Sequence, residues 1–468
     1  MHRELARVVG SEYALPAPGP ASPYNSDASG RRGLVGRADA VVLPGSAEEV
    51  AAVLAWCYEH DVPLIARGGG TGLVGGAVPS EGGVVCSLER LRGVRELEPG
   101  LWRMSVEAGV TTRHVQRLAR ENGLFFGPDP GGADQAQIGG NVATNAGGPH
   151  ALKYGVTGAW VTGLEVALAP GELLALGGWI RKDVSGYDLK DLLIGSEGTL
   201  GIVTAVRLRL LPAPESTVTM VFFLADEREG CDAALELLAA GMRPSVLDFL
   251  DGTTLQIVAR AYPPARASGA DGPRGEPLPG GVPAGAGFAL IVELDGSAAD
   301  TAAQRAEAAG LLSAAVAVHE PVEDEALWRW RDGVNPAVTG ARGAKVSADV
   351  VVPIERLMRV LARFETIASE EGLASCAWGH AGEGNVHATV LVDRSSEEEL
   401  DAADRTMERL YDVVAELEGS IAGEHGVGLL KAGALARQWA PRGIELHEQI
   451  KRAFDPKNLL NPGKKLAR

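Results

Sequence analysis

Cysteine is scarce in this sequence, and its scarcity excludes two kinds of structure. The 468 residues include four cysteines, and no two of them form a C-x-x-C pair. Scattered positions of this kind suit neither a disulfide framework nor an iron–sulfur cluster, because both need cysteines at motif spacing. The four are Cys57, Cys86, Cys231 and Cys376.

Long hydrophobic runs and an excess of basic charge are also missing. Hydrophobic residues make up 46% of the chain, but no run approaches the roughly 20 apolar residues of a membrane-spanning helix. Residues 1–7 lack the basic-then-apolar order of a signal peptide, so a cytoplasmic location is expected, with attachment to the periphery of the inner membrane left open. The formal net charge of −17 argues against nucleic acid as a partner, because phosphate binding needs a basic surface.

Glycine, by contrast, is abundant. The chain has 61 glycines, well above the usual share of about 7%. They gather in residues 67–76 and 127–155, which we expect to be loops whose backbone packs close to a large ligand. A single glycine is more often a tight turn than a ligand contact, so the prediction depends on the clusters.

The length of the sequence predicts more than one domain, because 468 residues are too many for one ordinary core. We expect three parts, which are residues 1–213, residues 214–421 and residues 422–468. Upstream of residue 213, strands are expected at 63–66, 84–88 and 204–211, with a hairpin over 162–178. Downstream, strands at 217–224, 288–294 and 345–352 alternate with helices at 228–240, 298–313 and 354–370, as in an α+β domain. A stretch rich in Pro, Gly and Ala, residues 263–286, is expected to be a surface insertion.

Two short segments near the C-terminus hold three of the nine histidines. One reads Gly-His-Ala-Gly-Glu-Gly-Asn-Val-His over residues 379–387, and the other reads Gly-Glu-His-Gly-Val-Gly over residues 423–428. On one straight strand, the spacing of His380 and His387 would place them on opposite faces. The glycines between them instead predict a turn that brings the two imidazoles together across a hairpin.

Two imidazoles and one carboxylate are the ligand set of an open divalent-metal site. His380, His387 and Glu424 are therefore the predicted metal ligands, and Zn²⁺ or Mn²⁺ suits such a set equally. His425 is next to Glu424 in the sequence, where it could accept a proton from whatever the metal holds. Without Glu424, two histidines beside a glycine turn would more simply be a solvated loop.

Gly70 to Gly75 matches the G-x-G-x-x-G fingerprint of NAD-binding Rossmann domains, and Glu89 is near the place of the ribose-binding acid. That fingerprint must open a helix whose N-terminus holds the pyrophosphate. Here the glycines continue into Ala-Val-Pro-Ser-Glu-Gly-Gly over residues 77–83, which cannot form a helix. The sequence therefore argues against NAD, although backbone N–H groups of a glycine loop can still form an anion nest.

Several motifs together indicate a different cofactor. The strand followed by Arg-Gly-Gly-Gly-Thr-Gly from Arg67, the glycine-rich stretch at 129–155 and the motifs at 186–189 and 195–201 follow one another in a fixed order. This order resembles the vanillyl-alcohol-oxidase-type (PCMH-type) FAD-binding fold. The histidine segments and the terminal stretch 454–463 are similar to its D-2-hydroxyacid dehydrogenase branch, which includes glycolate, D-lactate and D-2-hydroxyglutarate enzymes.

The resemblance covers roughly residues 35–465 and implies an α+β architecture. It predicts a PCMH-type FAD-binding domain of two α/β subdomains, an α+β substrate (cap) domain with an antiparallel sheet, and a C-terminal helical segment that returns to the FAD domain. FAD is expected to be bound non-covalently. The expected FAD contacts are Arg67, Gly68, Gly69, Gly70, Thr71, Gly72, Gly75, Pro128, Asp129, Pro130, Gly131, Gly132, Gly139, Gly140, Asn141, Thr144, Asn145, Gly147, Gly148, Tyr154, Gly155, Glu197, Gly198, Gly201, Ile202 and Asn461.

The same resemblance implies an activity, the oxidation of a small D-2-hydroxy acid to a 2-oxo acid. The metal would bind the substrate carboxylate and hydroxyl, His425 would be the general base, and flavin N5 would take the hydride. Arg331, Lys345 and Asn385 are the expected substrate-binding residues, although Arg331 could equally be a surface arginine of a helix.

Two departures from the family pattern and several alternatives remain. Gly132-Ala133 replaces a small hydroxyl pair, and Glu383 replaces an aspartate of the histidine motif. The competing functions are a flavin-carrying electron-transfer subunit of a larger oxidase complex and a metal-free flavin oxidase or transferase. The substrate, the electron acceptor (a quinone, an electron-transfer flavoprotein, a cytochrome or O₂) and a homodimeric state are left open.

Overall fold

The computed structural model describes residues 1–468 except 181, 263–277, 279–280, 321–323 and 467–468. The chain forms two compact units. The first comprises residues 1–148, 154–213 and 424–468, and the second comprises residues 149–153 and 214–423. The Pro/Gly-rich stretch expected at 263–286 lies mostly outside the described residues.

The first unit begins with a four-stranded sheet in the order β1-β2-β4-β3. β2, β4 and β3 run parallel, and β1 is antiparallel to β2. The parallel strands are apolar because helices α1 (His2–Val9) and α2 (Ala47–Glu59) pack on them and keep them from water. Ser46 caps α2 by accepting a bond from the Glu49 N–H. The strands are β1 (Ala14–Pro16), β2 (Ala40–Val42), β3 (Leu64–Arg67) and β4 (Val84–Ser87).

A five-stranded antiparallel sheet in the order β5-β6-β10-β8-β9 completes the first unit. Its strands are β5 (Val94–Glu98), β6 (Arg103–Glu107), β10 (Ile202–Arg209), β8 (Val161–Leu168) and β9 (Glu172–Gly177). β8 and β9 form the hairpin expected over 162–178. The adjacent elements are α3 (Thr112–Glu121), α6 (Leu189–Leu193), the short β7–β11 pair (Leu124–Phe125 with Leu211–Pro212) and α14 (Pro441–Phe454), whose Ile450 and Phe454 pack against the same core.

The prediction of a loop throughout 127–155 was wrong. Residues Ile138–Thr144 form helix α4, and Ala151–Tyr154 form the single turn α5. Ile138 and Val142 are one helical turn apart and both are fully buried, so their burial outweighs the helix-propensity cost of two glycines, about 1 kcal/mol each. Asn145, with φ of 52°, ends the helix in the left-handed region.

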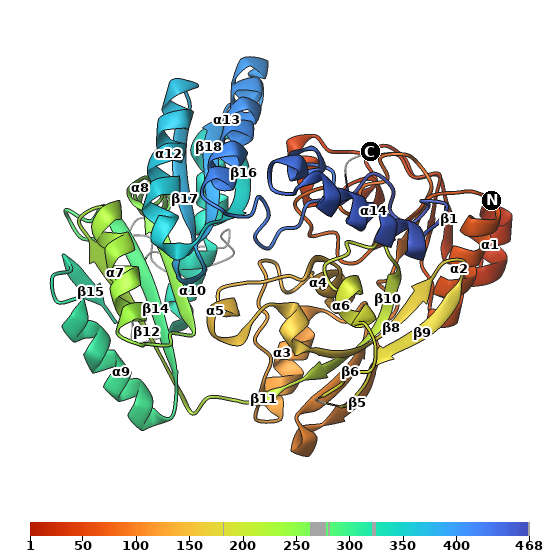
Figure 1. Cartoon of the computed structure of the whole chain (residues 1–468), viewed down its shortest axis with the longest axis horizontal. Coiled ribbons are helices and arrows are strands. Elements are labelled where there is room, and N and C mark those ends of the chain that lie inside the picture. The colour runs from red at the N-terminus through yellow and green to blue at the C-terminus, as the bar shows by residue number, and fades with distance from the viewer. Residues whose placement is uncertain (181, 263–277, 279–280, 321–323, 467–468) are drawn as a thin grey trace. The chain divides into compact units, whose positions relative to one another are not determined.

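The second unit is built on a seven-stranded antiparallel sheet in the order β15-β12-β14-β13-β17-β18-β16 (Figure 1). Helices α7 (Glu227–Ala239), α9 (Ala298–Leu311), α12 (Leu357–Glu370) and α13 (Glu397–Glu416) pack against the sheet, as do α8 (Gly252–Ala261), α10 (Asp324–Asp332) and α11 (Val334–Arg342). The strands are β12 (Ser216–Leu224), β13 (Val246–Asp251), β14 (Phe288–Gly296), β15 (Ala317–His319), β16 (Ala344–Val351), β17 (Ala374–His380) and β18 (Asn385–Val392).

Residues 149–153 leave the first unit and join the second. Lys153 Nζ pairs with the carboxylate of Asp295 and donates to its backbone oxygen at 2.9 Å, and His150 Nε2 pairs with Glu293 Oε1 at 2.8 Å. Glu293 and Asp295 are two residues apart on β14 and therefore face the same side of the sheet. These two buried carboxylates thus hold a short segment that sequence alone assigned to the FAD domain.

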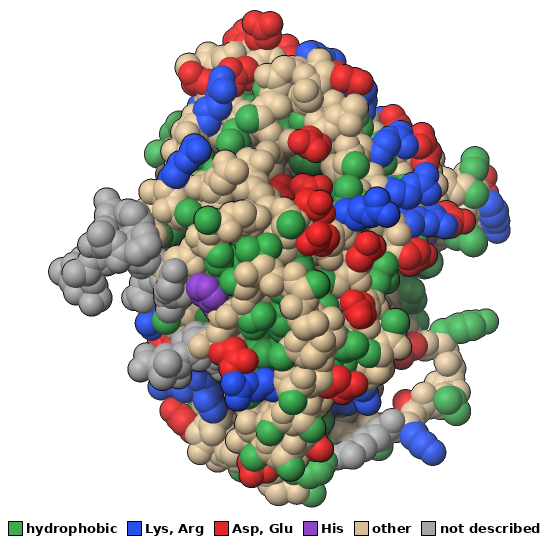
Figure 2. All heavy atoms as spheres, turned by 90° about the vertical axis from the view of Figure 1, so that its left-hand side faces the viewer, with side chains coloured by type: hydrophobic (Ala, Val, Ile, Leu, Met, Phe, Trp, Pro, Cys, Tyr) green, Lys and Arg blue, Asp and Glu red, His purple; other side chains and the backbone are tan. Residues whose placement is uncertain are grey.

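Charges on the surface are mixed. Acidic, basic and hydrophobic side chains are interspersed on the face drawn in Figure 2. Helices α12 and α13 are linked by the ion pair Arg363–Glu416 at 3.0 Å. Within the described part of the chain, no helix combines the length and hydropathy needed to cross a bilayer.

Candidate functional site

A pocket in the first unit gathers the glycine-rich motifs. The loop after β3, the start of α4 and the turn before β10 line it together. Its lining contains these predicted FAD residues: Arg67, Gly68, Gly69, Gly70, Thr71, Gly72, Pro130, Gly131, Gly139, Gly140, Asn141, Thr144, Gly147, Glu197, Gly198, Gly201 and Ile202. The remaining predicted contacts lie outside the lining: Gly75, Pro128, Asp129, Gly132, Asn145, Gly148, Tyr154, Gly155 and Asn461.

The loop after β3 needs its glycines for close backbone packing. A Cβ on Gly69 would lie 1.9 Å from the backbone oxygen of Gln135, and Gly70 has φ of 68°. Arg67 is buried at the end of β3, where its Nη1 donates to the backbone oxygen of Ser26 at 2.6 Å. Burial lowers the pKa of Arg67, while the charge of Asp27 acts in the opposite direction.

The lining fits a flavin dinucleotide. The backbone N–H groups of a glycine loop beside the buried guanidinium of Arg67 suit an anionic group such as a pyrophosphate. Gln137 also lines the pocket, and its buried Oε1 has no hydrogen-bond partner within the described residues. A buried amide oxygen of this kind is costly unless it accepts a bond, which a ligand could supply.

Glu424 and His425 line the same pocket as the glycine loops. His425 Nε2 lies 3.8 Å from Glu424 Oε1. The backbone that follows them is fixed by Glu197, whose carboxylate accepts from the N–H of Val427 at 2.9 Å and of Gly428 at 2.7 Å. Glu197, predicted as an FAD contact, therefore also fixes the loop that carries His425.

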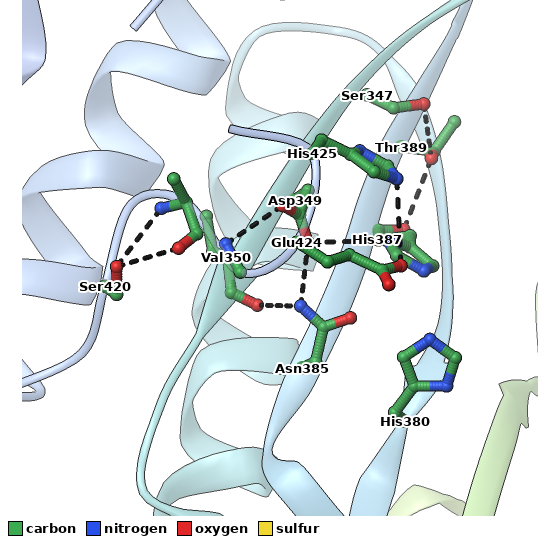
Figure 3. Close-up of polar contacts among 12 residues, drawn as sticks. Ser347, Asp349, Val350, His380, Asn385, His387, Thr389, Ser420, Glu424 and His425 are labelled. Atoms are coloured by element: carbon green, nitrogen blue, oxygen red, sulfur yellow. Dashed lines mark hydrogen bonds and ion pairs between the residues drawn. The ribbon is translucent and has the colours of Figure 1, made fainter. Parts of the chain in front are cut away.

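In the second unit, the histidine motif forms a hairpin, as the glycine spacing predicted. β17 ends at His380, a short 3₁₀ turn covers residues 381–383, and β18 begins at Asn385, which lies opposite His380. The two imidazole rings lie 5.5 Å apart between centroids and stand edge to face (Figure 3). Both histidines are buried.

A buried carboxylate, Asp248 on β13, contacts two of the predicted site residues. His380 Nδ1 is 2.6 Å from Asp248 Oδ1, and Arg331 Nε donates to Asp248 Oδ2 at 2.9 Å. Burial alone would raise the pKa of Asp248, but the charges of His380 and Arg331 outweigh it and lower the pKa to about 2. Arg331 was expected either to bind substrate or to lie on the surface. Its side chain is 12% exposed, so it is not a surface arginine, and substrate binding stays a prediction.

A second buried carboxylate, Asp349 on β16, fixes the entry to the Glu424-His425 segment. Asp349 Oδ1 accepts from Asn385 Nδ2 at 2.7 Å, and Oδ2 accepts from the Gly423 N–H at 2.9 Å (Figure 3). Asn385 Nδ2 also donates to the Val350 backbone oxygen at 3.1 Å. Lys345, on the same strand, stands over the Trp378 ring, with Nζ 4.5 Å from its centroid.

Replacing Gly423 with alanine should disturb this arrangement. A Cβ at this position would lie 2.1 Å from Asn385 Nδ2 and 2.7 Å from Asp349 Oδ1. Neither atom can retreat without losing its hydrogen bonds, so the segment leading to Glu424 must shift. We expect the variant to lose about 1–3 kcal/mol of stability and to bind divalent metal more weakly. Thermal denaturation and metal titration measure both, and an unchanged melting temperature would contradict the packing argument.

The residues missed by sequence reasoning are Asp248, Asp349 and Gln137. Asp248 could have been found from the sequence, because it interrupts an otherwise apolar strand, Val246-Leu-Asp-Phe-Leu. A buried aspartate in such a strand needs a partner, which indicates a functional or structural network. Asp349 directly precedes three valines, residues 350–352, which is a weaker indication, and the sequence around Gln137 gives none.

Comparison with known proteins covers most of the chain. Residues 38–177 match the family described as "FAD binding domain", and residues 213–465 match "FAD linked oxidases, C-terminal domain". Glycolate oxidase subunit GlcD of Bacillus subtilis (strain 168) is 35% identical over 92% of this chain and 89% of its own length. D-Lactate dehydrogenase of Anaerostipes hadrus is 32% identical over 92% and 89%. D-2-Hydroxyglutarate dehydrogenase of Xanthomonas citri pv. viticola is 36% identical over 91% and 88%.

Among solved structures, p-cresol methylhydroxylase with substrate bound has the same fold. Its TM-score is 0.80 at 19% identity, over 99% of this chain and 96% of that one. This likeness supports the PCMH-type FAD-binding architecture and agrees with the fit of the glycine-lined pocket. The chain therefore belongs to the family of FAD-linked oxidases, with an FAD-binding domain followed by the C-terminal domain of that family.

Proposed function

We propose that this protein oxidises a D-2-hydroxy acid to the corresponding 2-oxo acid, with His425 as the general base. The observation that carries the proposal is the composition of the pocket, in which Glu424 and His425 line the same space as the FAD-type glycine loops. The names of three relatives support the substrate class, because they are enzymes of glycolate, D-lactate and D-2-hydroxyglutarate. FAD, when bound, supplies the acceptor for the C2 hydride at its N5 atom.

The chain's own residues would then bind the substrate and move its proton. His425 takes the proton of the 2-hydroxyl group, which is the work of a general base. The anchored backbone on both sides supports this role, because Glu197 holds Val427 and Gly428, and Asp349 holds Gly423. Arg331 and Lys345 are proposed to bind the substrate carboxylate, and Asn385 to orient the substrate or a metal ligand.

We propose that His380, His387 and Glu424 hold a divalent metal, either Zn²⁺ or Mn²⁺. The donor set supports this, since two buried imidazoles already lie 5.5 Å apart between ring centroids, and Asp248 takes Nδ1 of His380 so that Nε2 is the ligand nitrogen. Such a metal would lower the pKa of the substrate hydroxyl and so ease its deprotonation.

A second function remains open, that of a flavin-carrying subunit in a larger oxidase complex. The name of one relative, a glycolate oxidase subunit, favours assembly with partners. In that case the electron acceptor would be reached through a partner chain. The two functions differ in one respect: a catalytic chain reduces its own flavin with substrate, and a pure electron carrier does not.

Anaerobic bleaching of the flavin absorbance tests the proposed function directly. The isolated chain, loaded with FAD and metal, is mixed with matched D and L forms of 2-hydroxy acids and with glycolate. We expect one or more D-acids or glycolate to bleach the flavin, while the L-acids leave it oxidised. Bleaching by L-acids alone, or by no acid of the panel, would reject the proposal.

Removal of the metal tests the metal-binding part separately. Treatment with a chelator, verified by elemental analysis, should slow flavin reduction by about 100-fold or more, because the hydroxyl would keep its ordinary pKa. The FAD content should not change, since the glycine pocket holds the flavin. Adding Zn²⁺ or Mn²⁺ back should restore the rate. Full activity in verified metal-free protein would rule out the metal site.

A further inference from the structure

Asp248 lies at the centre of the second unit. It is on β13, between β14 and β17, and its side chain is completely buried. It is opposite His380 in the β13–β17 ladder, so both side chains point to the same face of the sheet. A carboxylate removed from water in this way is stable only where donors satisfy both of its oxygens.

The two oxygens of Asp248 have separate partners. Oδ1 is 2.6 Å from His380 Nδ1, while Oδ2 lies 2.9 Å from Arg331 Nε and 2.8 Å from Arg331 Nη2. One carboxylate thus joins a histidine at the end of β17 to an arginine of helix α10. The partners are far apart in the sequence, at separations of 132 and 83 residues, so the fold alone brings them together.

Helix α10 has a second attachment to the same sheet. Trp328 Nε1 donates to Glu293 Oε2 on β14 at 3.2 Å, and Trp328 and Arg331 are three residues apart and therefore on one face of α10. Glu293 is also buried, and its carboxylate pairs with His150, Ser245 and Trp328. Asp248 and Glu293 therefore both hold α10 against the sheet, and Asp248 also pairs with His380.

We propose that Asp248 is a positioning residue that aligns His380 for metal binding and Arg331 for the substrate carboxylate. The inference rests on the proposed function, because it takes His380 as a metal ligand. With Nδ1–H directed to the carboxylate, His380 presents Nε2, and the ring cannot rotate without breaking that bond. With Nε and Nη2 directed to Oδ2, the remaining edge of the Arg331 guanidinium has a fixed direction.

The expected size of the effect follows from comparable carboxylate–histidine–metal arrangements. Loss of such an outer carboxylate typically weakens metal binding by about 10- to 100-fold. Without Asp248, His380 can take either tautomer and several ring orientations, and only one combination presents Nε2 correctly. Arg331 would also lose the charge that compensates its burial.

The test measures metal binding, not turnover. FAD-loaded, metal-free chains are titrated with Zn²⁺ against a competing chelator, and Co²⁺ is then used for its ligand-field spectrum. Asp248→Asn should bind Zn²⁺ about 10- to 100-fold more weakly than the wild type and should change the Co²⁺ band intensities. The matched control Glu293→Gln weakens the other attachment of the same helix and leaves the Asp248–His380 pair in place, so it should keep both the affinity and the spectrum.

A second variant covers the case in which Asp248→Asn alone folds poorly. Combining it with Arg331→Met removes the unpaired guanidinium, and the double variant should show the same loss of metal affinity. Wild-type affinity and spectrum in both variants would overturn the inference, as would an equal loss in Glu293→Gln. Failure of the proposed metal site would look different. The wild type itself would then bind no stoichiometric metal, and His380→Ala would change nothing. That result would also overturn the role of Asp248.

Discussion

Replacing His425 with alanine is expected to slow the reduction of FAD by a D-2-hydroxy acid by about 10²- to 10⁴-fold. The imidazole would no longer accept the hydroxyl proton, and C2 would have to release its hydride from a neutral alcohol. The fold should not change, because Glu197 and Asp349 hold the surrounding backbone. FAD content should therefore match that of the wild type.

Anaerobic stopped-flow absorbance measures this rate under single-turnover conditions. His447 offers a matched control, since it is a histidine of α14 that stacks on Trp439 and is outside the pocket lining. His447→Ala should reduce its flavin at the wild-type rate. Near-normal reduction in His425→Ala would require another base, whereas loss of FAD from that variant would indicate a structural role for the imidazole.

The sequence predicts those parts of the site that are built from local motifs. The turn between His380 and His387 follows from the glycines between them, and the fold places the two rings 5.5 Å apart between centroids. The glycine loop after β3 is equally local, because Gly69 and Gly70 permit a close backbone approach within a few residues of the strand. Such features depend on short-range stereochemistry, which the order of residues determines.

Features that depend on partners far along the chain could not be read in this way. The role of Asp248 depends on its contacts with His380 and Arg331, and that of Asp349 on its contact with Gly423. The fold brings these partners together. Helix α4 was missed for a related reason. The propensity of two adjacent glycines predicts a loop, whereas the burial of Ile138 and Val142 in the finished core favours a helix.

The assignment of residues 149–153 also needed the fold. In the sequence they continue the glycine-rich stretch, and nothing in them indicates a second unit. Their ties to Glu293 and Asp295 depend on carboxylates more than 140 residues away, with separations of 143 and 142 residues. Long-range ion pairing of this kind leaves no periodic pattern in a single sequence.

A valine at Gly140 is expected to abolish FAD binding while the protein stays folded. Gly140 lines the pocket, and a Cβ placed there would meet no described atom within 4 Å. The new side chain would therefore enter the space that the cofactor needs, without a clash in the protein itself. Valine is not a worse helix former than glycine, so α4 should not be weakened. We expect FAD affinity to fall by about 100-fold or more, which corresponds to about 3 kcal/mol.

Two other glycine-to-valine variants separate a blocked pocket from a damaged fold. Gly310 is in α9, where a Cβ also meets nothing within 4 Å of the described atoms, and it lies outside the pocket lining; Gly310→Val should keep its FAD. Gly139 precedes Gly140, but its Cβ would lie 2.7 Å from Ala108 Cβ, so Gly139→Val should lose stability as well as FAD. Flavin-to-protein absorbance ratios and thermal denaturation distinguish the three outcomes. Full FAD content in a folded Gly140→Val protein would place the flavin elsewhere and remove the basis for His425 as its neighbour.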